Sequence, residues 1–280
     1  MYLSIIIPTL GRSKELVDVL RSIEPELSDN VEVIIVDQNP QGFLESAIPQ
    51  GLQKQITIYH TSQKGASRAR NTGIALAKGR YINFCDDDAI VEPGFCKKIT
   101  AGFEKYPQAS MITFRVFDLE EDIPCMLPFP ETDCQIDKHN YYSTTLEISQ
   151  VWVTKDIREL EGYDVQLGVG APFGAEEGKD LIVRALEASC AMFYIADTGF
   201  RHPSKQEASM KRYFSYAEGT AAFACKHWRK PYVTSHVAGF LFKSVAGVMI
   251  YNVWKRHETQ RYWMRLAGFF SGMKKKIKGA

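Results

Sequence analysis

Short apolar runs rich in β-branched residues alternate with segments of helical spacing along the first half of the chain. Runs of this kind are typical of parallel strands that are buried on both faces of a sheet. Four of them occur at residues 3–7, 31–36, 56–60 and 81–85. Helical spacing is found at residues 13–23, 66–78 and 93–106. The alternation predicts an α/β fold with a doubly wound, largely parallel sheet flanked by helices.

The middle of the chain continues this pattern after an irregular stretch. Strands are predicted at residues 110–117, 151–154 and 191–195, and a helix at residues 176–187. Residues 119–145 contain three prolines and many polar side chains without a clear periodicity. A loop of this length inside a compact domain is usually functional or mobile.

Charge divides the chain near residue 204. Residues 205–280 contain 15 Lys and Arg against 3 Asp and Glu, a net charge of +12. Residues 1–204 contain 19 against 30, a net charge of −11, and the two parts add to the +1 of the whole chain. We therefore expect an acidic body over residues 1–204 and a basic helical extension over residues 205–280 that attracts an anionic surface.

The extension combines basic residues with apolar segments. Residues 206–227 suit a helix, and residues 237–254 form a mostly apolar stretch that includes Lys243. A spanning helix would carry this lysine at a cost of about 2.5–3.5 kcal/mol, and the stretch is barely long enough to cross a bilayer. An amphipathic helix lying in the interface fits better, with each basic residue adding about 1 kcal/mol near an anionic leaflet. A buried helical pair or a dimer contact is the alternative.

Nucleic acid is a poor partner for this chain, because no groove-reading or base-stacking module is evident and the body is acidic. The six cysteines form no CxxC pair and no zinc-like spacing. Cys85 and Cys190 lie in apolar runs and are expected to be buried free thiols. The first residues lead into a strand without a basic segment or cleavage site. These features predict a reducing, cytoplasmic location.

Three aspartates, Asp86, Asp87 and Asp88, follow the fourth apolar run. A strand that ends in this way places carboxylates at the carboxyl edge of the sheet, where open α/β folds bind ligands. Adjacent carboxylates repel one another unless a positive charge lies among them, and their oxygens suit Mg²⁺ or Mn²⁺. The triplet therefore favours a divalent metal with a bound diphosphate over an exposed acidic turn.

Six segments, taken in order, resemble the family 2 glycosyltransferases of the GT-A fold. They are Ile5-Ile6-Ile7-Pro8-Thr9, Val36-Asp37, Gly65–Gly73, Asp86-Asp87-Asp88, Glu177–Leu181 and His202-Pro203. The resemblance implies a Rossmann-like, nucleotide-sugar-binding catalytic domain over roughly residues 1–204. It also implies transfer of a sugar from a nucleotide diphosphate, UDP first, to a saccharide or lipid-linked saccharide in cell-surface polysaccharide assembly. We expect the enzyme at the inner face of the plasma membrane, held peripherally by residues 205–280, with a homo-oligomer as a further possibility.

The same resemblance implies roles for individual side chains. Asp88, with Asp86 as its partner, would bind Mn²⁺ or Mg²⁺, and His202 would be a further ligand, although it also suits a surface histidine before proline. A metal that bridges the phosphates neutralises charge on the leaving group. Asp87 would contact sugar or ribose hydroxyls. The residues implied to bind the nucleotide-sugar are Pro8, Thr9, Asp37, Arg68, Arg70, Asn71, Asp86 and Asp87.

Positive and aromatic side chains near these segments have two interpretations each. Guanidinium groups suit diphosphate oxygens, so Arg68 and Arg70 are expected to contact phosphates or structural carboxylates, with a solvated helix face as the alternative. Lys64 better fits a solvated surface. Trp152 either stacks on a sugar ring or packs in the core.

Two positions depart from the family pattern. Gln38 follows Asp37 where an aspartate is frequent, which can alter the preferred nucleotide. Gly178 occupies the place of the acidic residue that serves as the base in many relatives, so the proton acceptor is Glu177, Glu176 or Asp180, with Glu177 as the first choice. No separate nucleophile is evident, so we expect a single displacement with inversion at the anomeric carbon.

Two other functions compete with this interpretation. A sugar nucleotidyltransferase would show a glycine-rich basic loop after the first strand, and Gly11-Arg12 is too sparse for one. A degenerate, non-catalytic membrane-bound sugar-binding partner is favoured by Gly178, but the intact aspartate triplet argues against it.

Overall fold

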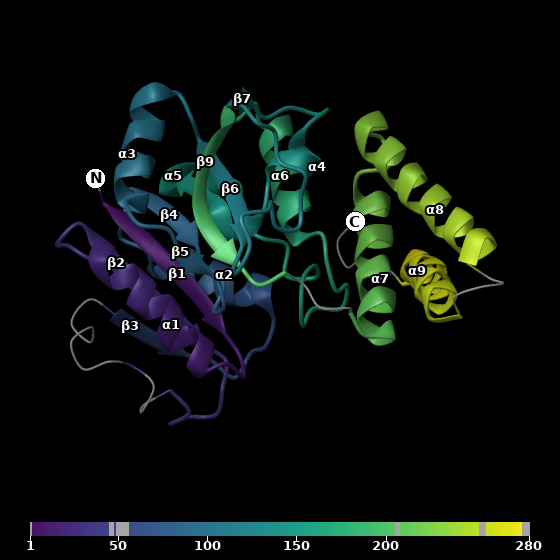
Figure 1. Ribbon diagram of the computed structural model, residues 1–280, viewed down its shortest axis with the longest axis horizontal. Helices are drawn as coiled ribbons and strands as arrows, with labels where there is room; N and C mark the ends of the chain where they lie inside the picture. The colour runs from purple at the N-terminus through teal and green to yellow at the C-terminus, as the bar shows by residue number, and fades with distance from the viewer. Residues whose placement is uncertain (1, 45–47, 49–55, 205–207, 252–255, 276–280) are drawn as a thin grey trace. The chain divides into compact units, whose positions relative to one another are not determined.

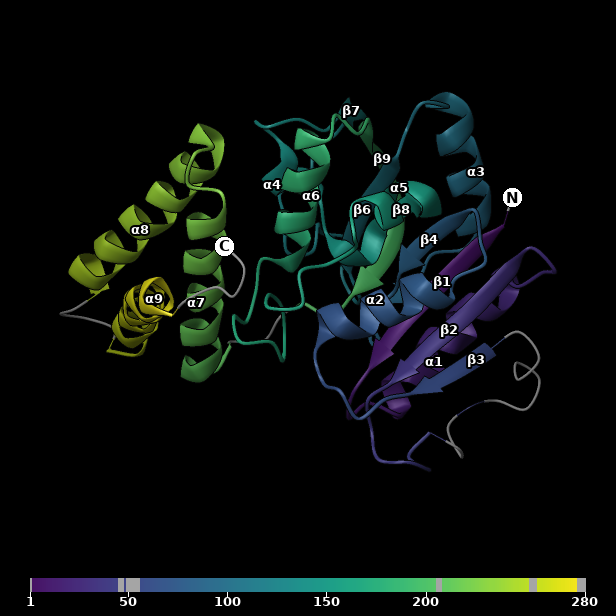
Figure 2. The same ribbon diagram turned by 180° about the vertical axis from the view of Figure 1, so that it is seen from behind.

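The computed structural model describes residues 2–44, 48, 56–204, 208–251 and 256–275. The chain forms two compact units, whose elements are shown in Figures 1 and 2. Unit 1 comprises residues 1–64, 68–163 and 181–204, and unit 2 comprises residues 65–67, 164–180 and 205–280. The segment 164–180, which holds all three predicted base residues, thus groups with residues 205–280.

Unit 1 is built on one mixed sheet. Its strands within the described residues are β1 (Leu3–Thr9), β2 (Val31–Asp37), β3 (Ile56–His60), β4 (Tyr81–Phe84), β5 (Ile90–Val91), β6 (Met111–Asp118), β7 (Cys134–Gln135), β8 (Gln150–Val153) and β9 (Met192–His202). They follow the order β3-β2-β1-β4-β8-β6-β9-β5, with β7 beside β9. The first four run parallel, whereas β8 is antiparallel to both of its neighbours. The predicted α/β class with a parallel core is confirmed; the antiparallel β8 was not predicted.

Helices cover the sheet as the apolar spacing predicts. Those of unit 1 are α1 (Lys14–Ile23), α3 (Phe95–Lys105), α4 (Tyr141–Thr144) and α5 (Thr154–Glu159), with short 3₁₀ turns at Glu24–Glu26 and Glu147–Ser149. The helices α2 (Ala66–Leu76) and α6 (Glu177–Glu187) begin with residues of unit 2 and continue with residues of unit 1.

The core of unit 1 lies on both faces of β1. Every residue from Leu3 to Ile7 is buried, as expected for a central parallel strand. Gly73 of α2 lies against the side chain of Ile6. On α3, Phe95 packs edge-on against Phe114 and Phe200. This packing fixes the strands whose ends carry the candidate site.

The parallel strands end at a common edge of the sheet. Thr9 at the end of β1 pairs in register with Asp37 at the end of β2, and Ile6 pairs with Phe84, two residues before the aspartate triplet. The predicted ligand-binding edge therefore carries residues from three neighbouring strands.

Within the described residues, three helices lie wholly in unit 2, and they pack through small residues. They are α7 (Met210–Lys226), α8 (Pro231–Tyr251) and α9 (Arg256–Lys274). Gly268 and Gly272 of α9 approach the backbone of α7, and Gly247 of α8 lies against the ring of Tyr262. The prediction of a helix followed by an apolar helix is confirmed for the described residues. Positions 252–254 of the apolar stretch, and 205–207 and 276–280 of the extension, lie outside them.

One described helix, α8, is long and apolar enough to cross a membrane, judged by its length and composition alone. A single helix of this kind is weak evidence for a span. One side of α8 is buried in unit 2 through Val233, Val237, Ser244 and Gly247, whereas Phe242 is 75% exposed and Met249 is 74% exposed. The helix therefore has a packed side and an apolar exposed side.

Burial decides between the two interpretations of Trp152 and tests the predictions for the cysteines. Trp152 is fully buried and donates its indole hydrogen to Gln150 Oε1 at 2.9 Å, so it is a core residue and not a sugar-stacking platform. All six cysteines are free. Cys85 is buried as predicted, but Cys190 is only half-buried, because it follows the end of α6 rather than lying within a strand.

Candidate metal and nucleotide site

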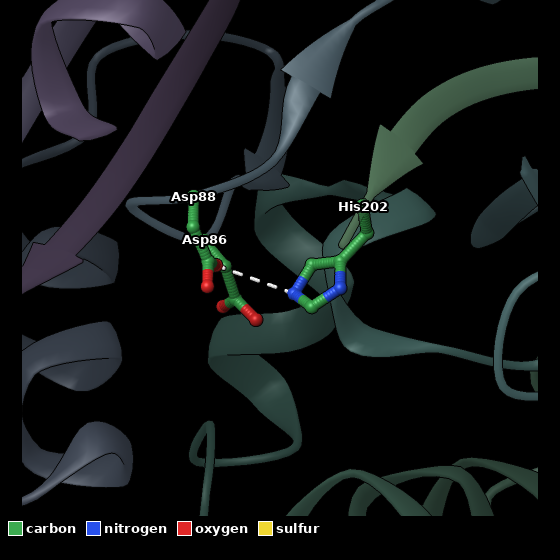
Figure 3. A group of neighbouring side chains, drawn as sticks. All are labelled: Asp86, Asp88 and His202. Atoms are coloured by element: carbon green, nitrogen blue, oxygen red, sulfur yellow. Dashed lines mark ion pairs between the residues drawn. The ribbon is translucent and has the colours of Figure 1, made fainter. Parts of the chain in front are cut away.

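Asp86, Asp88 and His202 meet at one edge of the sheet in unit 1 (Figure 3). The two aspartates follow β4, and His202 is the last residue of β9. One ligand atom from each of the three side chains lies within 4.8 Å of the others. His202 Nε2 is 3.2 Å from Asp88 Oδ1. The structure thus brings together the three residues predicted to bind metal.

The donor set fits a divalent ion. His202 Nδ1 lies 2.8 Å from the carbonyl oxygen of Pro203, a contact that orients Nε2 toward Asp88. Although burial acts against both shifts, the contact with His202 lowers the pKa of Asp88, and Asp88 raises the pKa of His202. Two carboxylates and one imidazole are ligands that Mn²⁺ and Mg²⁺ sites use, with imidazole favouring Mn²⁺.

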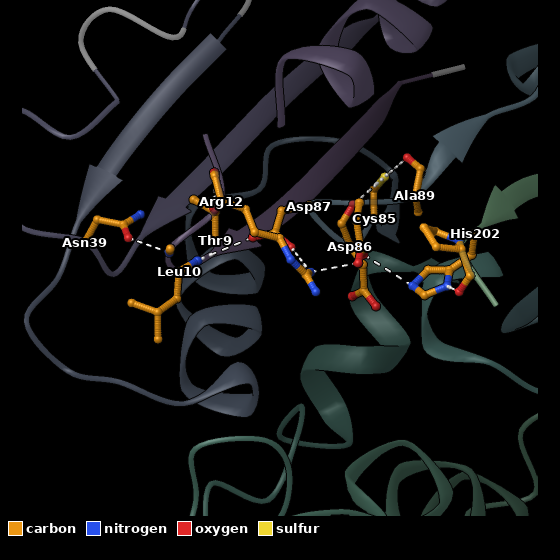
Figure 4. A network of polar contacts seen from close by, with 12 residues as sticks. Thr9, Leu10, Arg12, Asn39, Cys85, Asp86, Asp87, Ala89 and His202 are labelled. Atoms are coloured by element: carbon orange, nitrogen blue, oxygen red, sulfur yellow. Dashed lines mark hydrogen bonds and ion pairs between the residues drawn. The ribbon is translucent and has the colours of Figure 1, made fainter. Parts of the chain in front are cut away.

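Asp87 points to the loop after β1 instead (Figure 4). Its Oδ1 accepts a hydrogen bond from Arg12 Nη1 at 2.6 Å, and its Oδ2 lies 3.4 Å from the amide of Leu10. Burial raises the pKa of Asp87 in spite of Arg12 and Thr9. The triplet is therefore divided: its outer members face His202 and its middle member faces β1.

Arg12 is the site residue that sequence reasoning missed. Its Nη1 also lies 2.9 Å from Asp88 Oδ2, so that one guanidinium nitrogen bridges two carboxylates of the triplet. Burial opposes the shift, but Asp87 and the other two aspartates raise the pKa of Arg12. The sequence feature that could have indicated this role is the position of Arg12, three residues after the first strand of a sheet whose edge carries three carboxylates.

The cations predicted near the triplet have different surroundings. Arg70 is buried, places Nη2 3.1 Å from Asp86 Oδ1, and lies over the ring of Tyr163. Arg68 and Lys64 are exposed. The side-chain amide of Asn71 makes two hydrogen bonds with the backbone of Tyr163: Nδ2 donates to the carbonyl and Oδ1 accepts from the amide, each at 2.8 Å. Arg70 therefore makes a carboxylate contact, and the phosphate role of Arg68 stays a prediction.

Asp37 lies fully buried at the end of β2, beside Thr9, which is also buried, and next to the half-buried Pro8. Its Oδ1 accepts from the amide and the side chain of Asn39, at 2.9 and 2.7 Å. Its Oδ2 lies 2.9 Å from His60 Nδ1. These contacts hold the buried carboxylate in one orientation at this edge of the sheet.

The three carboxylates predicted as the base belong to unit 2. Glu177 is buried, and its carboxyl lies beside Gly168, where an added Cβ would be 2.9 Å from Glu177 Cδ. The same Cβ would be 2.8 Å from Ser67 Oγ, which donates to the carbonyl of Leu167. Gly168 has φ of +105°, a backbone conformation that favours glycine. This glycine gives the Glu177 carboxyl its room.

Glu176 precedes α6 in a left-handed conformation, with φ of +74°. Its Oε1 accepts a hydrogen bond from Thr220 Oγ1 of α7 at 3.0 Å. Gly219 of α7 lies against the backbone of Ala175. Unfavourable backbone conformations persist where their surroundings hold them, and they are frequent at functional sites.

Asp180 is fully buried among basic residues of α7 and the turn after it. Its Oδ1 lies 2.8 Å from both Lys226 Nζ and His227 Nε2, and Lys226 also lies 2.7 Å from Asp164. These contacts suit a residue that ties the start of α6 to α7.

Comparison with known proteins adds the family. The profile described as Glycosyl transferase family 2 matches residues 4–145, just over half of the chain. The chain belongs to this family. An uncharacterized glycosyltransferase of Haemophilus influenzae is 32% identical over 111 residues, covering 39% of this chain and 37% of the relative. The pre-mycofactocin glycosyltransferase of Mycobacterium tuberculosis is 24% identical over 209 residues, covering 70% of this chain and 43% of the relative. This chain therefore matches less than half of the length of each of these two relatives.

Solved structures show the same fold. TarS residues 1–349 of S. aureus have a TM-score of 0.69 at 15% identity, covering 98% of this chain and 81% of that one. The mannosyltransferase PcManGT of Pyrobaculum calidifontis, in complex with GDP-Man and Mn²⁺, has a TM-score of 0.67 at 13% identity, covering 98% and 88%. The expected α/β fold of GT-A type, with its C-terminal helices, is confirmed.

Proposed function

We propose that the chain is a metal-dependent glycosyltransferase that moves a sugar from a nucleotide diphosphate, with UDP as the first candidate, to a saccharide or lipid-linked saccharide. The observation that carries the proposal is the convergence of Asp86, Asp88 and His202 at the sheet edge that also holds Asp37. Support comes from family 2 membership and from the fold shared with TarS, solved with UDP-GlcNAc, and with PcManGT. Cell-surface polysaccharide assembly is the proposed setting.

In this proposal Asp86, Asp88 and His202 hold Mn²⁺ or Mg²⁺. The bound ion would supply charge neutralisation on the diphosphate leaving group. Asp37, at the same edge of the sheet, is assigned to the nucleotide base, the role that the family resemblance implies for this aspartate. Asp87, oriented by Arg12, binds a sugar or ribose hydroxyl.

We assign the general base to Glu177, with Glu176 as the alternative. Glu177 is buried beside Gly168, and Glu176 accepts a hydrogen bond from Thr220. A base must be held in position to accept a proton from the acceptor hydroxyl. Asp180 is disfavoured, because it is fully buried and its Oδ1 already contacts Lys226 and His227. Direct attack of the acceptor gives inversion at the anomeric carbon.

Unit 2 is the proposed membrane-facing part. The exposed side of α8 presents Phe242, Val245, Met249 and Ile250, and residues 205–280 carry a net charge of +12. Exposed apolar side chains with basic neighbours bind anionic membrane surfaces. The location suits a lipid-linked acceptor at the inner face of the plasma membrane.

Calorimetric titration of UDP, GDP and CDP in the presence of Mn²⁺ tests the nucleotide assignment. We expect UDP to bind most tightly, and Asp37→Asn to weaken it by about tenfold, since a charge-assisted hydrogen bond contributes about 1.5–3 kcal/mol. Asp18→Asn on the exposed face of α1 is the matched control and should bind as the wild type does. A protein that binds none of the three nucleotides would contradict the proposal.

A further inference from the structure

Arg12 links the two halves of the candidate site in unit 1 (Figure 4). It lies in the loop after β1, where Gly11 has φ of +81° and donates its amide to Asn39 Oδ1 at 2.6 Å. Asn39 in turn donates to Asp37. The loop that carries Arg12 is thus tied at one end to the carboxylate proposed to bind the nucleotide base. At its other end the guanidinium reaches the aspartate triplet.

The contact with the triplet involves a metal-binding candidate. Asp88 uses Oδ2 for Arg12, at 2.9 Å, and Oδ1 for His202, at 3.2 Å. A divalent ion on Asp88 would therefore share this carboxylate with a permanent positive charge. Asp87 keeps the guanidinium in place with the shorter contact of 2.6 Å. Since the guanidinium is nearly half exposed, at 43%, it can also turn toward an anion in solution.

We propose that Arg12 competes with the divalent cation for Asp88, and that the diphosphate of the nucleotide relieves this competition by offering the guanidinium a second anion. Metal and nucleotide then bind cooperatively, each being weak without the other. This role of Arg12 rests on the proposed metal site and nucleotide donor. In it Arg12 is not a metal ligand but sets how metal binding and nucleotide binding affect each other. The coupling is reciprocal, so nucleotide raises the affinity for metal by the factor by which metal raises the affinity for nucleotide.

Mn²⁺ affinity measured without nucleotide tests the competition directly. Free Mn²⁺ is followed by electron paramagnetic resonance in titrations of the wild type, Arg12→Gln and Arg12→Lys. We expect Arg12→Gln to bind Mn²⁺ about tenfold more tightly, because a unit positive charge beside a divalent ion is removed. Arg12→Lys keeps the charge and should stay close to the wild type. Arg21→Gln is the matched control, since Arg21 is exposed on α1 and its contact is with Asp18.

The same titrations with saturating UDP test the coupling. The wild type should gain affinity for Mn²⁺ when UDP is present, and Arg12→Gln should gain much less. A loss of folding is a poor explanation for tighter binding, and thermal unfolding of each variant checks this.

The outcomes separate the inference from the proposed function. Suppose that Asp88→Asn abolishes Mn²⁺ binding but that Arg12→Gln binds Mn²⁺ no more tightly than the wild type. This result would overturn the competition and leave the proposed metal site in place. Equal Mn²⁺ binding by the wild type and Asp88→Asn would overturn both.

Discussion

Alanine at Gly219 tests whether helix α7 holds the carboxylate segment before α6. An added Cβ would lie 2.6 Å from the amide nitrogen of Ala175 and 2.7 Å from its carbonyl oxygen. Both neighbours are backbone atoms and cannot rotate away, so either the helix or the segment must move. The neighbouring residue Thr220 would then lose its hydrogen bond to Glu176.

Two opposing effects set the size of the change. Alanine favours the helix over glycine by about 1 kcal/mol. Overpacking costs about 1–3 kcal/mol, and the lost hydrogen bond costs about 0.5–1.5 kcal/mol. The net expectation is a destabilisation of about 0.5–3.5 kcal/mol. At Gly239 of α8 an added Cβ meets nothing within 4 Å, so Gly239→Ala should stabilise the protein by about 0.5–1 kcal/mol.

Chemical unfolding of the two variants, followed by nucleotide release from a sugar donor, provides the assay. We expect Gly219→Ala to unfold at lower denaturant than the wild type and to lose about tenfold or more in turnover, because small displacements of catalytic groups are costly. Gly239→Ala should unfold at higher denaturant with unchanged turnover. Equal stability of the two variants, or full turnover in Gly219→Ala, would refute the role given to α7.

Three further predictions follow from the same structure. Glu177→Gln should lower turnover by about 10²-fold or more with little change in UDP binding, and Glu176→Gln should have the smaller effect; the reverse order in steady-state kinetics would move the base to Glu176. Burial and two nearby lysines lower the pKa of His236 to about 4. The unfolded chain therefore binds a proton near pH 6.5 that the folded protein binds only near pH 4, and stability is lost as pH falls through this window. Denaturant unfolding at pH 7 and pH 5 should show a smaller loss of stability for His236→Gln than for the wild type, and equal losses would contradict the assignment. Phe242→Glu combined with Met249→Glu should reduce co-sedimentation with phosphatidylglycerol vesicles but not change the monomeric mass in solution, whereas a change of mass alone would indicate a dimer face.

The fold and the position of the aspartate triplet at the sheet edge could be predicted because their signals are local. Buried strands can be recognised in the sequence as runs of β-branched residues, and carboxylates that follow such a run lie at the sheet edge. His202 could be connected with Asp88 only through a family resemblance, since the two are far apart in the chain. The structure supplies the reason for their meeting: β9 is longer than the apolar run that predicted it and ends beside the triplet.

The remaining site contacts depend on side chains that meet without a local pattern. Nothing in the spacing indicates that Arg12 bridges Asp87 and Asp88, because this depends on the path of the loop after β1. The partners of Asp180, likewise, lie more than forty residues away in α7 and the turn that follows it. Such contacts arise from packing, and packing decides which of several similar carboxylates is available for chemistry.

Nucleotide release from a panel of UDP-sugars, measured with Mn²⁺ for the wild type and Asp88→Asn, tests the central claim most directly. The account predicts release from one donor or a few, its loss on chelation of the metal, and a decrease of about 10²-fold or more in the variant. Release at equal rates by both proteins, or release that survives removal of the metal, would contradict a metal-dependent transferase centred on Asp88.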